Sequence, residues 1–331
     1  MKSFFPRRLP HFTAHLAALL ALLLAAPCAM AQSDFPDHPL RLVIGFPPGT
    51  ATDAAARVIA TKMADTLKQQ VIVDNKPGAG TNIAAMAVVH AAPDGYTLFM
   101  LGNSNTVNPA LLKSVPFDVQ KDFAPVALAA TVPSILVVNP SLGVNSVAQL
   151  IAAAKARPGK IFFASSGNGT MSHLAGELFG MSTGAKMTHV PYKGSSQAVT
   201  DLLAGTVPVM FAPASTVLPF VHDGKLKALA STGATRARIA PDLPTIAELG
   251  VKNYDTRIWF GVAAPAATPA PVMRKLAEAV DAAVASDSVR DQLAPQGIEP
   301  YRGDARAFAE QIDRELKKWS AVIKAAGIQP D

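Results

Sequence analysis

The chain has 331 residues, a formal net charge of +6 and one cysteine. Its length is sufficient for two domains of ordinary size. The small net charge, with no lysine or arginine run longer than two, excludes the strongly basic class of nucleic-acid-binding proteins.

The first 31 residues have the pattern of a secretory signal peptide. They contain three basic and no acidic residues, and an apolar stretch at 16–26 that is shorter than the roughly 20 residues a membrane span needs. The small residues "AMA" at 29–31 precede Gln32 and form a cleavage site. We therefore expect a periplasmic protein that begins near Gln32, with its net charge lowered from +6 by three, to +3.

Cys28 lies inside this predicted peptide, so the mature chain is expected to contain no cysteine. That excludes disulfides, thiol catalysis and cysteine metal sites in the mature protein. Cys28 also leaves a lipid-anchored surface adhesin as an alternative, although Pro27 before it is unfavourable in a lipoprotein signal.

Strand-like and helix-like segments alternate from residue 40 onward. Apolar runs predict strands at 40–46, 70–75 and 96–101, and helical spacing predicts a helix near 52–68. This alternation indicates an α/β fold with a mainly parallel sheet.

A long extended segment at 124–140 contains Pro133. Proline cannot donate a backbone hydrogen bond, so it suits an edge or a crossing segment better than a central strand. We expect crossings between two lobes near 127–135 and 228–234. Lobe 1 then comprises 32–130 and 233–331, and lobe 2 is inserted as 131–232.

Helix and strand signals continue through the second half. Ser146 and Gln149 form a predicted capping box for a helix near 147–156, and Thr268 with Pro269 is a predicted N-cap and first turn. The remaining predictions are a strand at 160–166, strand–turn–helix units at 160–180, 187–205 and 207–221, an extended piece at 225–233, and a helix near 269–285. A last helix is marked by apolar residues at helical spacing and closed by Gly327, and these residues are Phe308, Ile312, Leu316, Trp319 and Ile323.

The segment "FPPGTATDAAAR" turns from strand to helix through small residues. Thr50 and Asp53 occupy the positions of a capping box, and Gly49 allows close backbone approach. A helix N-terminus has unpaired N–H groups and a partial positive charge, so it attracts anions. The alternative is an ordinary capped helix behind a strand.

The segment "SSGNGTMSHLAGELFG" has the same arrangement. A strand ends at Ser165 and Ser166, Gly167 and Gly169 free the backbone, and Thr170 can cap the next helix. Ligands of open α/β sheets bind beyond the carboxyl ends of the strands. We therefore predict that two Gly-Thr helix starts, one per lobe, hold one anion between them.

These segments resemble the Bug family, the periplasmic substrate-binding proteins of tripartite tricarboxylate transporters. The resemblance runs from about Phe35 to the C-terminus and rests on "FPPGTATDAAAR", "NKPGAGTNIAA", "ASSGNGTMSHLAGELF", "HVPYKGSSQAVTDLLAG", "ALASTGATR" and "WFGVAAP". It implies an α/β, two-lobed periplasmic binding protein fold of type II, with two open α/β domains joined by two crossing extended segments. It also implies closure on small carboxylates and related solutes.

In such proteins, backbone N–H groups and waters at the first lobe's loop hold a ligand carboxylate, and the second lobe's loop completes the site. The implied ligand-binding residues are Phe46, Gly49, Thr50, Ala51 and Asp53 in the first loop, and Ser165, Ser166, Gly169, Thr170 and His173 in the second. Further strand ends add Asn103, Ser104, Lys193 and Ser215 as residues of a distal pocket.

Three of these residues also have structural interpretations. Asp53 is a cap and stands four residues before Arg57, the favourable order for a helical ion pair. His173 is either a structural hydrogen-bonding group or a ligand contact, and Lys193 is either solvated or attracts a distal carboxylate. The family usually has Pro-Gly-Gly where this chain has Pro-Gly-Thr, so the identity of the solute does not follow from the relatives. Dicarboxylates, tricarboxylates, aromatic acids and amino acids all stay candidates.

The resemblance implies a monomer that delivers its solute to the permease subunits of a tripartite transporter, or to a sensor. It implies no cofactor, no metal and no nucleic-acid partner. An exported α/β hydrolase is the alternative, but "SSGNG" is not the Gly-x-Ser-x-Gly nucleophile elbow and "PGAGTN" lacks the third glycine of a dinucleotide loop. The sequence therefore predicts a binding protein and not an enzyme.

Overall fold

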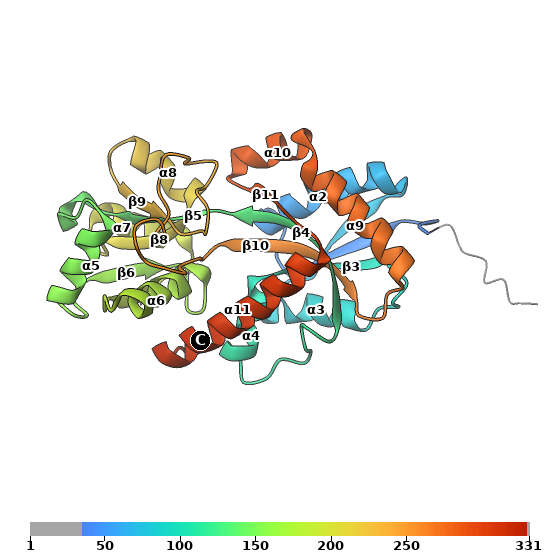
Figure 1. Cartoon of the computed structure of the whole chain (residues 1–331), viewed down its shortest axis with the longest axis horizontal. Coiled ribbons are helices and arrows are strands. Elements are labelled where there is room, and N and C mark those ends of the chain that lie inside the picture. The colour runs from blue at the N-terminus through green and yellow to red at the C-terminus, as the bar shows by residue number, and fades with distance from the viewer. Residues whose placement is uncertain (1–34, 330–331) are drawn as a thin grey trace, which may run out of the picture. The chain divides into compact units, whose positions relative to one another are not determined.

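A computed structural model describes residues 35–329. The predicted signal peptide, its cleavage site and Cys28 lie outside the described residues. Within the described part, strands and helices alternate along the chain and form a six-stranded and a five-stranded sheet (Figure 1).

The six-stranded sheet has the order β11-β4-β10-β3-β1-β2. β1 pairs in parallel with β2 and β3, whereas β10 is antiparallel to β3 and β4, and β11 is antiparallel to β4. Its strands are β1 (Leu40–Ile44), β2 (Val71–Asn75), β3 (Thr97–Gly102), β4 (Phe123–Val132), β10 (Ile258–Pro265) and β11 (Glu299–Gly303).

The five-stranded sheet has the order β7-β6-β8-β5-β9. β6 pairs in parallel with β7 and β8, and β5 is antiparallel to β8 and β9. Its strands are β5 (Ser134–Val138), β6 (Phe162–Ser165), β7 (Thr188–Pro191), β8 (Val209–Pro213) and β9 (Lys227–Ser231). Both sheets are thus mixed: most strands of each run in one direction, as expected, but β10 and β11 in the first sheet and β5 in the second run antiparallel to them. β5 and β10, the first strands after the two crossings, run against the direction of the βα units in their sheets.

Helices cover both faces of each sheet. In the first lobe, α2, α9 and α10 pack together, and α4 packs along α11 on the opposite side (Figure 1). The α-helices are α2 (Ala51–Leu67), α3 (Asn82–Val89), α4 (Asn103–Leu111), α5 (Val147–Ala156), α6 (Met171–Thr183), α7 (Ser195–Ala204), α8 (Ala214–His222), α9 (Ala270–Ala285), α10 (Asp287–Leu293) and α11 (Ala305–Ala326). Short 3-10 turns are η1 (Ala79–Thr81), η2 (Pro140–Leu142) and η3 (Ala294–Gln296).

The alternation of side chains along β5 divides the core of the second lobe into two layers. Ile135 and Val137 pack with α7 and α8 residues on one face. Leu136 and Val138 pack with α5 and α6 residues on the other. A strand buried on both faces reads as a continuous apolar run, which explains why "SILVV" shows no polar alternation.

The chain passes between the two sheets at Pro133, which separates β4 from β5. This confirms the expectation that Pro133 lies in a crossing segment. The second crossing lies at 256–258 and not at 228–234, because 227–231 is a strand of the second sheet and the segment after it stays with that sheet. Ile246, for example, donates its N–H to the Ser231 carbonyl at 2.9 Å.

Helix α11 is a third connection between the lobes. Near its start, Phe308 and Ile312 pack with residues of the first sheet. Near its end, Trp319 and Ile323 pack in the core of the second lobe. The predicted apolar face and the Gly327 terminus are confirmed, but the helix does not belong to lobe 1 alone. The spacing of the apolar residues predicts which face of the helix is buried, but it does not predict which lobe covers that face.

Two predicted helix caps differ from expectation. The Ser146 hydroxyl accepts the N–H of Gln149 at 3.2 Å, but the Gln149 side chain accepts from Asn145 and not from Ser146. The Thr268 hydroxyl donates to the Pro265 carbonyl at 2.7 Å, so it satisfies the preceding strand instead of capping α9.

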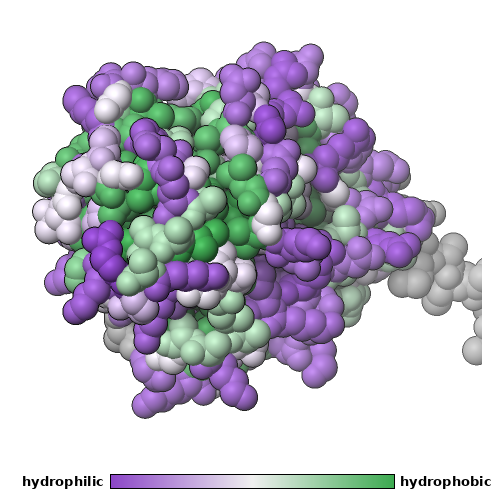
Figure 2. All heavy atoms as spheres, turned by 60° about the vertical axis from the view of Figure 1, so that its left-hand side comes forward, coloured by the Kyte–Doolittle hydropathy of each residue, from purple (hydrophilic) through white to green (hydrophobic). Residues whose placement is uncertain are grey.

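Figure 2 shows the side of the second lobe, where hydrophobic residues gather in the middle between hydrophilic margins. Exposed large hydrophobic residues of this lobe include Phe162, Met181 and Leu249.

Along residues 35–329, no helix combines the length and the apolar character that crossing a membrane requires.

Candidate functional site

The first candidate loop follows β1 and opens α2. Thr50 is the N-cap residue, and its hydroxyl donates to the Pro47 carbonyl at 2.9 Å and accepts the Asp53 N–H at 3.3 Å. Gly49 has φ +83°, a conformation that glycine adopts without strain. The loop is exposed at Gly49 and Ala51 and half-buried at Phe46 and Thr50. The predicted helix start is therefore present at an accessible edge of the sheet.

Asp53 is the centre of this loop and is only 5% exposed. Its carboxylate accepts the Gly49 N–H at 3.0 Å, the Asn75 amide at 3.0 Å and the guanidinium of Arg57 at 2.9 and 3.0 Å. Burial raises the pKa of Asp53, but the hydrogen bonds from Arg57, Asn75 and Gly49 outweigh burial and lower the pKa to about 2. The carboxylate thus holds the loop backbone, the end of β2 and the first turns of α2 together, and Arg57 neutralises its charge.

The second candidate loop follows β6 and opens α6 in the same way. Gly169 has φ +69°, and its N–H donates to His173 Nδ1 at 3.1 Å. Thr170 is the N-cap residue, but its hydroxyl donates to the Gly167 carbonyl at 2.7 Å and makes no cap bond. The expectation that the Thr170 side chain caps α6 is therefore wrong, because the preceding turn takes the hydroxyl.

The two loops share one construction. In each, a threonine hydroxyl donates to the carbonyl three residues before it, and a glycine N–H donates to the side chain four residues after it. The N–H groups of Gly49 and Gly169 are therefore engaged within their own loops. The donors left for an anion are those of the first helical turn, such as Ala51 and Ser172, which have no acceptor inside a helix.

A pair of histidines lies beneath the second loop. The rings of His173 and His189 stack at 3.6 Å with an angle of 8° between them. His189 Nε2 lies 2.6 Å from Ser165 Oγ, which also receives the Gly167 N–H at 3.1 Å. Ser165 has no exposed surface, so this serine–histidine contact supports the loop instead of presenting a nucleophile.

The other predicted residues do not all join these loops. Asn103 is buried and its side chain is committed to a network between the lobes. Lys193 is exposed, whereas Ser104 and Ser166 are half-buried. Ser215 lies at the start of α8, where a Cβ added at Gly297 of the first lobe would overlap it.

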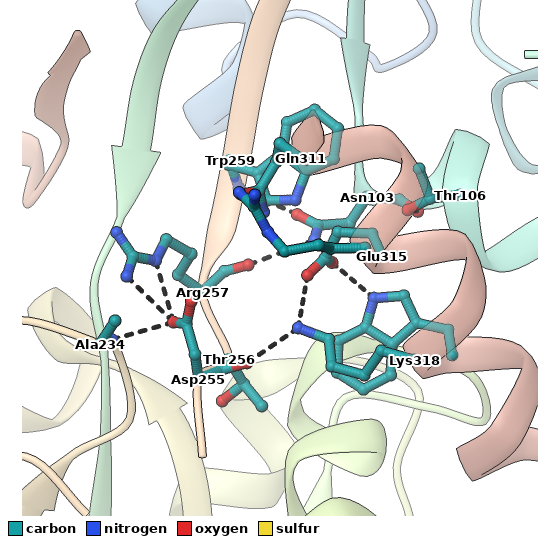
Figure 3. A network of polar contacts seen from close by, with 12 residues as sticks. Asn103, Thr106, Ala234, Asp255, Thr256, Arg257, Trp259, Gln311, Glu315 and Lys318 are labelled. Carbon is teal, nitrogen blue, oxygen red and sulfur yellow. Dashed lines mark hydrogen bonds and ion pairs between the residues drawn. The ribbon is translucent and has the colours of Figure 1, made fainter. Parts of the chain in front are cut away.

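Figure 3 shows the network that holds Asn103. The buried carboxylate of Glu315 on α11 accepts from Asn103 Nδ2 at 3.2 Å, from Trp319 Nε1 at 2.6 Å and from Lys318 Nζ. Lys318 also donates to the Asp255 carbonyl at 2.9 Å, beside the second crossing. No local sequence pattern indicates this network, because its members come from three distant segments.

Asn75 is also a residue of the site that no local sequence pattern indicates. It ends β2 opposite Ile44, and its amide nitrogen also donates to the Phe46 carbonyl at 3.0 Å. Among residues 35–329, no cluster of three or more His, Cys, Asp or Glu side chains is arranged to hold a metal ion.

Comparisons with known proteins assign the family. The model of the tripartite tricarboxylate transporter family receptor matches residues 55–328. The chain is 37% identical to protein BugT of Bordetella pertussis over 306 residues, which cover 92% of this chain and 93% of BugT. The chain belongs to the tripartite tricarboxylate transporter receptor family. The family match includes the second candidate loop and begins just after the first.

Solved structures of the receptor family agree in fold. An R. palustris protein solved with adipate is 37% identical and superposes with a TM-score of 0.73, covering 90% of this chain and 100% of that one. MatC from Rhodopseudomonas palustris, solved with bound malate, is 30% identical with a TM-score of 0.69, covering 87% and 100%. The fold is that of a two-lobed α/β periplasmic binding protein.

Proposed function

We propose that this receptor captures a small carboxylate-bearing solute between the loops at 46–53 and 165–173. The observation that carries the proposal is the matched pair of Gly-Thr helix starts, one at the carboxyl end of β1 and one at the carboxyl end of β6. Helix N-termini bind anions through backbone N–H groups, so no arginine clamp is required. Two relatives solved with adipate and malate support a dicarboxylate.

The two-lobe division is part of this proposal. Lobe 1 contains the six-stranded sheet, lobe 2 contains residues 134–256 with the five-stranded sheet, and α11 is shared. Hydrogen bonds to a charged group contribute roughly 1.5–3 kcal/mol each. Several such bonds, less the cost of closure and desolvation, reach the roughly −8 kcal/mol of micromolar binding.

The proposed place of the protein is the periplasm, where a monomer hands its solute to the permease subunits of a tripartite transporter. We propose no catalytic role. The serine–histidine contact at Ser165 is the arrangement closest to a hydrolase site that the loops contain, and Ser165 is fully buried.

A calorimetric titration with adipate, malate and citrate tests the proposal, with adipamide as the uncharged control. We expect saturable binding of at least one carboxylate and none of the diamide. A ligand at about 100 times its dissociation constant also adds roughly 2.7 kcal/mol to the free energy of unfolding.

Thr50→Val removes the cap hydroxyl of the first loop and should weaken binding. Thr61→Val is the matched control, because Thr61 lies on the same helix and its hydroxyl only donates to the Arg57 carbonyl. Equal binding of adipate and adipamide, or hydrolysis of ester substrates by the purified protein, would contradict the proposal.

A further inference from the structure

The glycine of each candidate loop is held by a side chain four residues later. In the first loop the acceptor is Asp53 Oδ2, 3.0 Å from the Gly49 nitrogen. In the second loop it is His173 Nδ1, 3.1 Å from the Gly169 nitrogen. Both acceptor atoms are bonded to the γ-carbon of their side chain. The same glycine hydrogen bond is therefore accepted by a carboxylate in lobe 1 and by an imidazole in lobe 2.

The acceptor in the second lobe depends on protonation. A neutral imidazole accepts only at the ring nitrogen that carries no proton, and a charged imidazole accepts at neither. The bond from Gly169 therefore requires an unprotonated Nδ1 and places the ring proton on Nε2. That nitrogen faces the Glu177 carboxylate at 3.7 Å.

The surroundings of His173 restrict its freedom to adjust. The residue is 4% exposed, and the His189 ring stacks on it at 3.6 Å. His189 on β7 and Glu177 on α6 are the titratable groups that face it. Through Ser165, His189 is bonded to the same loop that His173 holds.

We propose that His173 is a positioning residue that holds the second loop in its binding conformation only while its imidazole is neutral. Protonation of Nδ1 removes the acceptor of the Gly169 N–H and places a cation against the His189 ring. Solute affinity then falls when acid protonates this ring, and the test spans about pH 8 to 5, the range in which histidine side chains as a class change charge. This inference rests on the proposed function, because the second loop must contact the solute.

The first loop does not share this sensitivity. Although burial raises the pKa of Asp53, its hydrogen bonds hold the pKa at about 2, so it accepts the Gly49 N–H throughout the same range. The structure thus makes one half of the site sensitive to acid and the other half insensitive.

A pair of amide variants separates the acceptor from the ring. In His173→Asn, Oδ1 occupies the place of Nδ1, accepts the Gly169 N–H and cannot be protonated in this range. In His173→Gln, the polar atoms lie one bond further out and the acceptor position is empty. His222→Asn is the control, since His222 is an exposed histidine at the far end of α8 in the same lobe.

The first measurement uses the protein without solute. Nitrogen-15 NMR of the histidine rings and of the Gly169 amide is followed from pH 8 to pH 5. We expect His173 to carry its proton on Nε2 at high pH, and the Gly169 amide resonance to titrate with the midpoint of the His173 ring. In His173→Asn, the Gly169 resonance should not titrate. A proton on Nδ1 at high pH, or a Gly169 resonance that does not follow the ring, overturns the proposal.

The second measurement is the dissociation constant of adipate at pH 8 and pH 6. Loss of one loop hydrogen bond corresponds to about a fivefold weakening for the wild type. The dissociation constant of His173→Asn should change less between the two pH values than that of the wild type. His173→Gln should bind adipate weakly at both. Because the carboxyl groups of adipate titrate alike with every variant, the comparison isolates residue 173.

The outcomes of the two measurements are separable. Affinity of the wild type that rises in acid relative to His173→Asn overturns the proposal, because the imidazolium then attracts the solute instead of releasing the loop. If adipate fails to bind at any pH, the proposed function fails for this solute, and the proton-dependent bond is still decided by NMR.

Discussion

At the scale of single residues, Asp53 connects the loop backbone, the neighbouring strand and the first helix. The loop glycine, Asn75 at the end of β2 and Arg57 one turn along α2 all donate to it. A single carboxylate thereby fixes the backbone whose remaining N–H groups are proposed to meet the solute.

Asp53→Asn tests this role through the dependence of stability on pH. The folded-state pKa of about 2 lies below the ordinary value of 3.8, so the carboxylate stabilises the fold above about pH 5 and less as the pH falls toward 2. We expect the variant to lose about 2 kcal/mol of unfolding free energy at pH 7. Urea denaturation at pH 7 and pH 3 should show the difference from the wild type narrowing in acid. A difference that is the same at both pH values would count against the ion pair.

Gly49→Ala and Gly169→Ala separate backbone strain from crowding. Both glycines have positive φ, but a Cβ at Gly49 meets open space, whereas one at Gly169 would overlap Leu111 at the end of α4. We expect about 1–2 kcal/mol of destabilisation at Gly49 from strain alone. Crowding adds about 1–3 kcal/mol at Gly169. Thermal denaturation of the two variants compares these costs, and an equal loss at both sites would show that Leu111 moves aside freely.

At the scale of elements, local patterns predicted most of the strands and helices. Thr50 as a cap, and Asp53 with Arg57 four residues later, follow from spacing within one helix. Asn75 did not follow, because its place beside the loop is set by the pairing of β1 with β2, in which Ile44 stands opposite Asn75. Sequence periodicity contains no information on that pairing.

Local patterns also did not predict the direction of the strands or the place of the second crossing, because both depend on contacts between distant segments. The segment after β9 contains glycine, threonine and proline and reads as a connection between lobes. In the structure, Ser231 pairs with Thr245, and Tyr254 packs in the second core. Long-range contacts therefore keep this segment with lobe 2 until Arg257.

The network at α11 gives a prediction at this scale. Glu315→Ala removes the acceptor of Asn103, Lys318 and Trp319, and leaves these donors in a largely buried site. Removing one partner of a buried ion pair costs about 3–5 kcal/mol. Glu310→Ala is the control, because Glu310 pairs with Arg306 on the exposed side of the same helix and should change stability by less than about 0.5 kcal/mol. Urea denaturation measures both, and a similar small loss in both variants would show that the network contributes little.

At the scale of the whole binding unit, three connections join the lobes, and two glycines lie in close contact with the opposite lobe. The connections are Pro133, the crossing at 256–258 and α11. One contact brings Gly169 of lobe 2 to Leu111 of lobe 1, and the other brings Ser215 of lobe 2 to Gly297 of lobe 1. Closure on a solute must be compatible with both contacts, since neither glycine position has room for a further carbon atom.

Gly297→Ala tests whether the second contact matters for closure. An added methyl group would overlap Ser215, so the lobes must separate at this side or the 294–297 turn must shift. Gly327→Ala is matched to it, because Gly327 has φ +64° against +67° at Gly297 and also ends a helical segment, yet its Cβ would meet nothing within 4 Å. Strain is then similar in both variants, and only Gly297→Ala pushes on the opposite lobe.

We expect wild type and Gly327→Ala to become more compact in small-angle scattering when adipate saturates them, through rigid rotation of the lobes about the crossings. Gly297→Ala should show a smaller decrease in radius of gyration and a several-fold weaker affinity for adipate in calorimetry. Circular dichroism confirms that each variant is folded. If Gly297→Ala closes and binds like Gly327→Ala, the side of the molecule at Ser215 does not take part in closure. The movement is then guided by Pro133, the 256–258 crossing and α11, together with the contacts that remain between the lobes, such as Gly169 with Leu111 and the Ile239 N–H with Glu299.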